Sequence, residues 1–303
     1  MTHVATLVTP EDGPVLDDAV IARAAAFLPN ATGPKWLAPQ VATDIPFAPV
    51  DPFDPRQVTD QIRTALTRLR IDVFIQPRAH RRKKLLLADM DSTMIQQECI
   101  DELADFVGLK DKVSAITERA MRGEIEFEPA LRERVALLRG LEHKIVERIL
   151  DERIVLTRGG RTLVQTMRAN GAHTVLVSGG FTVFTEKIAA AIGFHEIRAN
   201  VLMIDGKFFA GTVNEPVLGR EAKVAALIEL RSKLGLNRAE TMAIGDGAND
   251  LAMLQEAGLG IAYHAKPAVA AAAHARVEHC DLTALLYAQG YRHSEFTEDS
   301  SPG

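Results

Sequence analysis

The sequence has little of what marks several large classes of protein. It contains only two cysteines, Cys99 and Cys280, which stand far apart and form no CxxC motif, so neither a disulfide framework nor a zinc knuckle is indicated. No apolar run approaches the roughly 20 residues that a membrane-spanning helix needs. The opening residues, MTHVATLVTPEDG, lack a basic segment followed by an apolar one, so we expect no secretory signal. These absences predict a reduced, cytoplasmic protein without a membrane partner.

Positive charge is not in excess either. Lys and Arg number 35 against 40 Asp and Glu, which gives a formal net charge of -5. A nucleic-acid binder usually shows a basic excess, so we predict no nucleic-acid partner. The composition, 47% hydrophobic and 25% charged, is ordinary for a globular protein with a sizeable core. A chain of 303 residues is expected to form one large or two smaller domains.

Three motifs that would indicate other chemistries are absent from the sequence. Without GxxxxGK[ST] or GxGxxG, a nucleotide-triphosphate or dinucleotide site has no support. Without GxSxG, a serine hydrolase has none either. Any chemistry must therefore rest on carboxylates.

The first 80 residues differ in composition from the rest. Ten of the fourteen prolines fall within residues 1–77, and such density breaks helices and favours turns. Between them the pattern predicts strands and helices near 3–8, 17–28, 35–47, 55–70 and 71–75. This order predicts a small N-terminal α/β domain over 1–80, ferredoxin-like in its β–α–β–β–α–β sequence. The basic stretch RAHRRKK (78–84) is expected to be a solvated linker that marks the boundary.

From Lys84 onward, apolar runs alternate with amphipathic helices, which predicts a Rossmann-like, three-layer parallel sheet. The expected strands are KKLLLAD, HTVLVS, TMAIGD and LGIAY, and the first three end in polar clusters that should meet at one crevice. We place the core at 81–97 and 151–292 and a helical lid at 98–150. A hairpin is expected at Asp205–Gly206, and a disordered tail over 293–303.

Two pairs of acids end two of these strands. Asp89 and Asp91 lie in DMDST, and Asp246 and Asp250 lie in GDGAND. Alone, DMDST could be a turn or a helix cap. Four carboxylates at adjacent strand ends instead make a hard-oxygen site, which selects Mg²⁺ together with waters and substrate phosphate.

A third cluster suits a phosphate group. The segment SGG (Ser178, Gly179 and Gly180) ends a strand and precedes a helix. Exposed N–H groups at a helix start favour phosphate, although a tight turn with no ligand would have the same sequence. Lys223 begins another helix and could supply a positive charge, although most such lysines lie on the surface.

Together, DMDST, SGG, Lys223 and GDGAND stand in the order that marks haloacid dehalogenase-like phosphohydrolases, and the resemblance covers about 84–290. Within that superfamily the chain resembles the phosphoserine phosphatase family. DMDSTMI is followed by ECIDELA, and then come a cap segment MRGEIEFEPALRERV, VSGGF and GDGANDLAML. The resemblance implies a Mg²⁺-dependent phosphoric monoester hydrolase of serine biosynthesis, with O-phospho-L-serine as its substrate.

The resemblance also implies roles for individual residues. Asp89 is the expected nucleophile and Asp91 the general acid and base, with its pKa raised by anionic neighbours. The expected metal ligands are Asp89, the backbone carbonyl of Asp91, and Asp246. Those expected to support the metal's waters or bind substrate are Asp250, Asn249, Glu98, Arg134, Ser178, Gly179, Gly180, Lys223, Met121 and Phe127. Met121 and Phe127 could equally pack in the core, and Arg134 could be a surface charge.

Three alternatives stay open at this point. The chain could hydrolyse another small phosphomonoester, it could transfer the phosphoryl group to another alcohol, or it could be a module that only carries phosphate on Asp89. The sequence does not specify an oligomeric state, although a homodimer is compatible with it. Some phosphoserine phosphatases carry an ACT-like N-terminal domain, and the element order over 1–80 is compatible with one.

Overall fold

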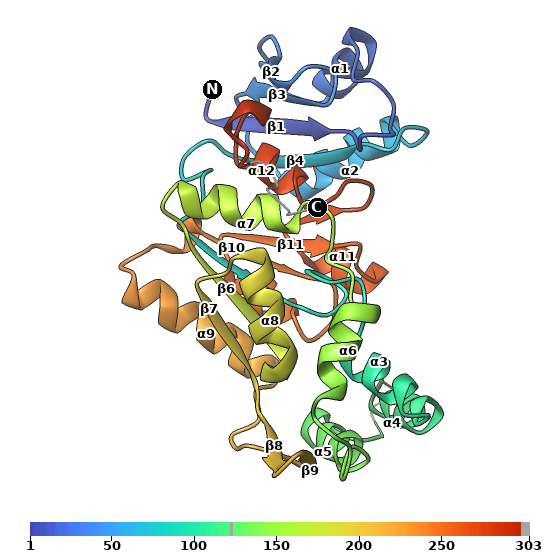
Figure 1. Cartoon of the computed structure of the whole chain (residues 1–303). Coiled ribbons are helices and arrows are strands. Elements are labelled where there is room, and N and C mark those ends of the chain that lie inside the picture. The colour runs from blue at the N-terminus through green and yellow to red at the C-terminus, as the bar shows by residue number, and fades with distance from the viewer. Residues whose placement is uncertain (122–123, 298–303) are drawn as a thin grey trace.

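The computed structural model describes residues 1–121 and 124–297, without the side chains of Ala120 and Met121. Figure 1 shows the N-terminal sheet stacked on a larger α/β core, with a helical cap and a β-hairpin at the opposite end of the core. Within the described residues, no helix is both long and apolar enough to cross a membrane.

The N-terminal unit is an antiparallel sheet in the order β2-β3-β1-β4. Its strands are β1 (His3–Val8), β2 (Lys35–Ala38), β3 (Ala42–Phe47) and β4 (Asp72–Pro77). The helices α1 (Asp18–Ala25) and α2 (Pro55–Ala65) pack on it around a separate apolar core that includes Leu7, Phe47 and Ile62. The element order and pairing agree with the predicted ferredoxin-like arrangement.

The larger sheet is parallel throughout, in the order β12-β11-β10-β5-β6-β7. Its strands are β5 (Leu85–Ala88), β6 (His173–Phe181), β7 (Glu196–Asn200), β10 (Thr241–Gly245), β11 (Leu259–Tyr263) and β12 (Ala275–Val277). The four predicted strands are confirmed and occupy the middle of the sheet. The edge strands β7 and β12 were not predicted, because EIRAN and ARV carry no apolar run.

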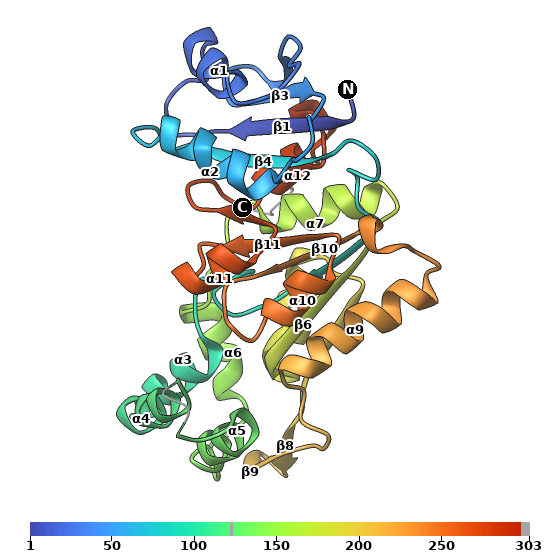
Figure 2. The same cartoon turned by 180° about the vertical axis from the view of Figure 1, so that it is seen from behind.

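Helices cover both faces of this sheet (Figures 1 and 2). Leu86 and Leu176 point into one apolar layer, while Leu85, Leu87 and Val175 point into the other. The first layer is closed by α7 (Gly160–Ala169), α8 (Thr182–Ile192) and α12 (Ala284–Ala288); the second is closed by α9 (Arg220–Lys233), α10 (Leu251–Glu256) and α11 (Pro267–Ala272). A short 3-10 turn, η1 (Arg238–Glu240), precedes β10. The three-layer prediction is therefore confirmed.

A cap follows β5, and its regular elements in 98–121 and 124–150 are all helices. It consists of α3 (Cys99–Phe106), α4 (Lys110–Met121), α5 (Phe127–Ala136) and α6 (Ile145–Glu152). The chain enters and leaves it side by side, since Ile95 forms a bridge with Leu156 and the Gln96 N–H donates to the Val155 carbonyl at 3.0 Å.

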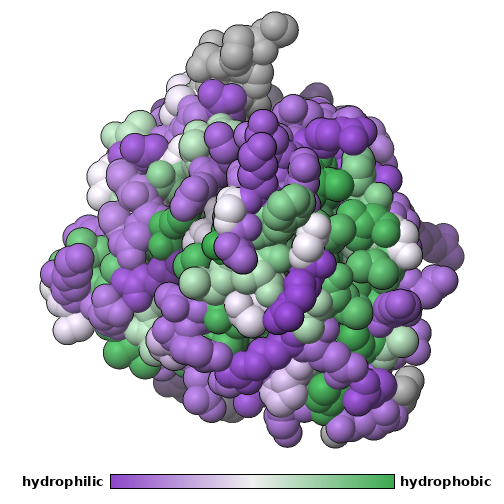
Figure 3. Space-filling model, turned by 60° about the horizontal axis from the view of Figure 1, so that its bottom comes forward, coloured by the Kyte–Doolittle hydropathy of each residue, from purple (hydrophilic) through white to green (hydrophobic). Residues whose placement is uncertain are grey.

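The predicted hairpin forms between β8 (Leu202–Asp205) and β9 (Phe208–Val213). Its turn residue Gly206 has a φ of 60°, a conformation that favours glycine. Strand β9 also pairs with the cap, where the Gly140 N–H donates to the Phe209 carbonyl at 3.0 Å. The molecular face at this end mixes apolar and polar residues (Figure 3), with exposed apolar side chains on the hairpin at Val201, Met203, Ile204 and Phe208.

The basic stretch 78–84 is solvated only in part: Arg78, Arg82 and Lys84 are exposed, as predicted, whereas Arg81 and Lys83 are not. Both Arg81 guanidinium nitrogens bind the Asp44 carboxylate of β3, at 2.5 and 2.6 Å, and the same side chain donates to the Tyr287 and Ala288 carbonyls of the core. Lys83 is buried and donates to two backbone carbonyls. The short connection forces these charges between the two units, where they are paired instead of hydrated.

The tail also departs from prediction where it is described. His293–Glu295 form a 3-10 turn, η2, Phe296 packs against the main core, and the Thr297 N–H donates to the Thr166 hydroxyl at 2.8 Å. Disorder was therefore wrongly predicted for 293–297, and residues 298–303 lie outside the described part.

Candidate active site

The two acid pairs meet at the carboxyl edge of the larger sheet. Asp89 follows β5 and Asp246 follows β10, and these strands are neighbours, with Ala88 paired to Ile244. One carboxylate oxygen each from Asp89, Asp246 and Asp250 lies within 4.8 Å of the others. Because the strand order changes direction between β5 and β10, this edge is where an open α/β sheet binds ligands.

Lys223 lies between two of these acids. Its ammonium is 2.7 Å from Asp89 Oδ2 and 2.8 Å from Asp250 Oδ1, and the residue is 1% exposed. Burial alone would lower the pKa of Lys223, but the two carboxylates outweigh this and raise it. The lysine is therefore a permanent buried cation at the site and not a surface charge.

The Asp250 carboxylate is fixed by the turn that carries it. The Gly247 N–H donates to Asp250 Oδ2 at 3.1 Å, and a methyl group at Gly245 would lie only 2.4 Å from Asp250 Cγ, so the turn needs glycine there. Burial and the nearby Asp89 raise the pKa of Asp250 to about 7, against the opposing effect of Lys223.

Asp91 lies next to this group and has few partners. The Cys99 N–H at the start of α3 donates to Asp91 Oδ1 at 3.1 Å, and a methyl group at Gly180 would lie 3.1 Å from Asp91 Oδ2. Burial, followed by the charges of Glu98 and Asp89, raises the pKa of Asp91 to about 8. The direction agrees with the sequence-based expectation, but burial contributes more than the anionic neighbours.

The predicted phosphate loop lies where β6 ends. Ser178 is 1% exposed, and its hydroxyl oxygen accepts from the Gly180 N–H at 2.8 Å. The ladder between β6 and β7 is interrupted between Val177 and Phe181, so Ser178 to Gly180 have no partner in β7, and Gly180 lies beside Asp91.

The cap contributes two charged residues that lie near each other, Glu98 and Arg134. Glu98, just before α3, is exposed; Ser92 Oγ donates to its Oε1 at 2.6 Å, and it lies close enough to Asp89 and Asp246 for their charges to act on it. Arg134 on α5 is partly buried. Burial lowers its pKa, while Asp101 and Glu98 act in the opposite direction.

Phe127, at the start of α5, closes the gap between cap and core. Methyl groups at Gly179 and Gly219 would lie 3.4 and 3.3 Å from its ring, so the ring rests over both glycines. The side chain of Met121, the other predicted wall residue, lies outside the described residues.

Two further groups support the acids. Asn249 Nδ2 is 3.4 Å from Asp89 Oδ2, a long contact. The Thr93 hydroxyl donates to Asp246 Oδ1 at 3.1 Å, and Thr93 is fully buried. Sequence reasoning gave Thr93 no role, although it is the last residue of DMDST and stands where the motif calls for Thr or Val.

The donor set fits a hard divalent cation. Every side-chain ligand that Asp89, Asp246 and Asp250 offer is a carboxylate oxygen, and these oxygens converge, as oxygen-ligated Mg²⁺ or Ca²⁺ requires. No histidine or thiolate belongs to this group, so among the described residues it does not resemble a zinc site.

Comparisons with known proteins agree with this geometry. Residues 86–255 match the model of the family described as haloacid dehalogenase-like hydrolase. A probable phosphoserine phosphatase from Schizosaccharomyces pombe is 44% identical over 211 residues, covering 69% of this chain and 70% of the relative.

Two solved structures match nearly the whole chain. A haloacid dehalogenase family hydrolase from Salmonella enterica has a TM-score of 0.84 and 27% identity, and the match covers 97% of this chain and 99% of that one. A probable phosphoserine phosphatase from Vibrio cholerae has a TM-score of 0.76 and 28% identity, with 97% and 88% covered. Both matches include the N-terminal sheet as well as the core.

Proposed function

The chain belongs to the haloacid dehalogenase-like hydrolase family, and we propose that it hydrolyses O-phospho-L-serine to L-serine and phosphate, the last step of serine biosynthesis. One observation carries this choice of substrate. Glu98 lies within range of the charges of Asp89 and Asp246, and the Arg134 guanidinium of the cap lies within range of Glu98. An amino acid with a phosphorylated side chain has the complementary charges at both ends.

The first half of the reaction uses Asp89 as the nucleophile. Its carboxylate attacks phosphorus, the bond from phosphorus to the serine oxygen breaks, and an aspartyl-phosphate remains. Lys223, 2.7 Å from Asp89 Oδ2, neutralises charge on the transferring group, as do the N–H groups of the Ser178–Gly180 loop. Positioning and electrostatics account for most of the catalysis of phosphoryl transfer.

Asp91 manages the proton. With a pKa raised to about 8, it is protonated near neutral pH and can give its proton to the departing serine oxygen. The resulting carboxylate then takes a proton from the water that attacks the aspartyl-phosphate. Phosphate leaves, and both Asp89 and Asp91 return to their starting states.

Asp89, the backbone carbonyl of Asp91, and Asp246 would hold Mg²⁺, while Asn249 and Asp250 would orient its waters. When bound, the ion neutralises negative charge on the phosphoryl oxygens. Thr93 fixes the Asp246 carboxylate for this task through its hydroxyl.

Glu98 and Arg134 read the amino-acid part of the substrate. The Glu98 carboxylate binds the α-ammonium, and the Arg134 guanidinium grips the α-carboxylate with two parallel hydrogen bonds. Phe127 covers the opening, and the proposed role of Met121 as a second wall rests on the sequence alone. The cytoplasm is the proposed location, in keeping with Cys99 and Cys280, which are free and buried as is usual in a reducing compartment.

The test is phosphate release from L-phosphoserine with Mg²⁺ and with EDTA, beside phosphothreonine, phosphoethanolamine and an aryl phosphate. Asp89→Asn serves as the blank, and we expect it to be inactive. Arg134→Ala should damage phosphoserine turnover far more than that of phosphoethanolamine, which has no carboxylate. Equal damage to both, or equal turnover of every ester by the wild type, would refute amino-acid recognition. Transfer of phosphate to added alcohols in place of water would indicate a phosphotransferase.

A further inference from the structure

A gap in the larger sheet contains an unusually well-bonded side chain. The β6–β7 ladder stops at Val177–Arg198 and resumes at Phe181–Asn200, so the backbone of Ser178, Gly179 and Gly180 has no strand partner there. Buried backbone groups without partners are costly. Asn200, the last residue of β7, pairs with Phe181 immediately after the gap and is 2% exposed.

The Asn200 carboxamide bonds to two separate segments. Its Nδ2 donates to the Gly179 carbonyl at 2.8 Å and to the Leu218 carbonyl at 3.1 Å. Its Oδ1 accepts from the Leu218 N–H at 2.6 Å. Both amide hydrogens and the carbonyl oxygen are therefore used, and the side chain acts toward Leu218 as a strand neighbour would.

These two segments carry different parts of the phosphate site. Gly179 follows Ser178, whose hydroxyl lies beside the catalytic edge. Leu218 is followed by Gly219 and then by α9, which carries Lys223 one turn later to its contacts with Asp89 and Asp250. Asn200 touches none of the reacting groups itself, yet it fixes the loop with Ser178 relative to the helix with Lys223.

The cap depends on the same junction. Phe127 rests over Gly179 and Gly219 together, and these glycines lie on the two segments that Asn200 joins. A shift of either segment would therefore move two things together: the surface on which the Phe127 ring packs, and the phosphate donors of the Ser178 loop and Lys223.

We propose that Asn200 is a positioning residue for phosphoryl transfer, which sets the separation of the Ser178 loop from the Lys223 helix and the seat of Phe127. The proposal rests on the function proposed above. Since a displacement of about 1 Å can cost about 100-fold in rate, loss of this amide should lower activity well beyond its effect on stability.

The chain offers a matched control in Gln289. This amide is also buried, at 1% exposed, and it ties the end of α12 to the segment before β5: its Oε1 accepts from the Lys83 N–H and its Nε2 donates to the Leu285 carbonyl of its own helix, both at 3.0 Å. Lys83 precedes β5, so Gln289 lies at the opposite end of the sheet from the acids. Its loss should lower stability without moving the phosphate site.

The experiment compares Asn200→Ala, Asn200→Asp and Gln289→Ala with the wild type. The readouts are kcat and KM on L-phosphoserine and on an aryl phosphate, inhibition by inorganic phosphate, and urea unfolding. We expect Asn200→Ala to lower kcat/KM about 10- to 100-fold on both esters and to weaken inhibition by phosphate. Gln289→Ala should lower the unfolding free energy by a similar amount. It should leave kcat/KM and the inhibition by phosphate unchanged.

Asn200→Asp keeps the shape and the acceptor but loses both donors, so it should resemble Asn200→Ala, and it carries the comparison if the alanine variant does not fold. Unchanged kinetics in a folded Asn200 variant, or an equal loss in Gln289→Ala, would overturn the proposal. If the wild type hydrolyses the aryl phosphate and not phosphoserine, the proposed substrate is wrong, while the aryl phosphate still decides the role of Asn200.

Discussion

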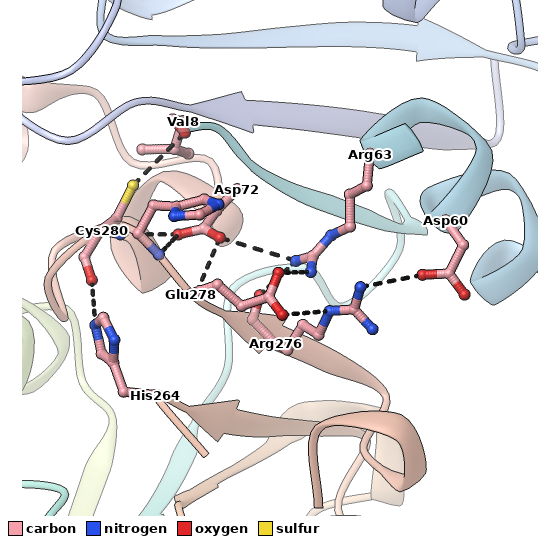
Figure 4. A network of polar contacts seen from close by, with 9 residues as sticks. Val8, Asp60, Arg63, Asp72, His264, Arg276, Glu278 and Cys280 are labelled. Carbon is pink, nitrogen blue, oxygen red and sulfur yellow. Dashed lines mark hydrogen bonds and ion pairs between the residues drawn. The ribbon is translucent and has the colours of Figure 1, made fainter. Parts of the chain in front are cut away.

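Where the N-terminal sheet meets the core, buried acids are surrounded by donors, whereas at the catalytic edge they are surrounded by one another. Asp72 of β4 is fully buried, and its carboxylate accepts from the Glu278, His279 and Cys280 N–H groups at 2.9 to 3.1 Å. Figure 4 shows this carboxylate at the centre of a network that continues through Arg63 and Arg276 to Asp60. The interface acids are satisfied by the protein alone.

The catalytic acids are not satisfied in this way. Asp91 has one backbone donor, and burial with neighbouring negative charge raises the pKa values of Asp91, Asp246 and Asp250. Lys223 offsets part of this charge, through direct ion pairs with Asp89 and Asp250 and at longer range for Asp246. The interface acids therefore stabilise the fold. The catalytic acids, which lack such partners, can still bind a cation, exchange a proton or contact a substrate.

The largest expected effect is loss of the proton carrier. Asp91→Asn keeps the size of the side chain but cannot exchange a proton, so kcat on phosphoserine should fall about 10²- to 10⁴-fold. The protein should remain folded, because Asp91 has a single backbone partner to lose. Steady-state kinetics with circular dichroism on the same sample test this, and near-normal kcat would remove Asp91 from the mechanism.

The opposite result is expected at the interface. Asp72→Ala leaves three backbone N–H groups without their acceptor and removes the ion pair to Arg63 at 3.8 Å, although Arg63 keeps Glu278 as a partner. The free energy of unfolding should therefore fall by about 3–5 kcal/mol. Activity per folded molecule should be unchanged. Asp60→Asn is the control, since its 62% exposed side chain pairs with Arg276 at 3.3 Å and should contribute about 1 kcal/mol or less. Equal losses of unfolding free energy in Asp72→Ala and Asp60→Asn would contradict the view that the buried acid stabilises the interface more than the exposed one.

Added Mg²⁺ should stabilise the protein by relieving repulsion among the catalytic acids. At about 100 times its dissociation constant, the ion should raise the free energy of unfolding by about 2.7 kcal/mol. Asp246→Asn should abolish most of this gain, whereas Asp72→Asn should keep it. Thermal or urea unfolding with and without Mg²⁺ measures it, and a full gain in Asp246→Asn would exclude Asp246 as a ligand.

A smaller effect concerns pH in the metal-free protein. Asp91 keeps its proton in the folded state to about pH 8, but in the unfolded chain it loses that proton near its usual pKa of about 3.9. Between these values the folded state binds more protons, so stability falls as pH rises, by at most about 1.4 kcal/mol per pH unit.

The measurement is urea unfolding in EDTA of the wild type and Asp91→Asn across this range. The stability of the wild type relative to the variant should decrease as pH increases. Curves that run parallel would show that Asp91 has the same affinity for protons in the folded and unfolded states.

Much of this molecule could be predicted from local pattern. The buried strands are continuous apolar runs, so LLLA and TMAIG indicated both the sheet and the edge at which Asp89 and Asp246 meet. The motifs then predicted Ser178 and Lys223, which the structure brings to that same edge. Their spacing along the chain follows from the alternation of strand and helix.

What escaped prediction depends on contacts between distant segments. Arg81 and Lys83 looked like solvated charges because their partners, Asp44 and Ala239, stand elsewhere in the chain. Asn200 carries no sequence signal because it ends a short polar edge strand. Its importance comes from a break in the β6–β7 ladder that only the folded sheet shows.

The pairing of β9 with the cap changes which part of the chain can move as one body. The hairpin contacts the cap through backbone bonds at Gly140, Leu141 and His143, so any opening of the cap must carry residues 201–214 with it or break those bonds. Such an opening would have to bend the chain at four crossings: near 96, near 155, and on either side of the hairpin. The part of the chain that would move together is therefore larger than the insertion of 98–150. Asn200 lies where the chain leaves the core sheet for the hairpin.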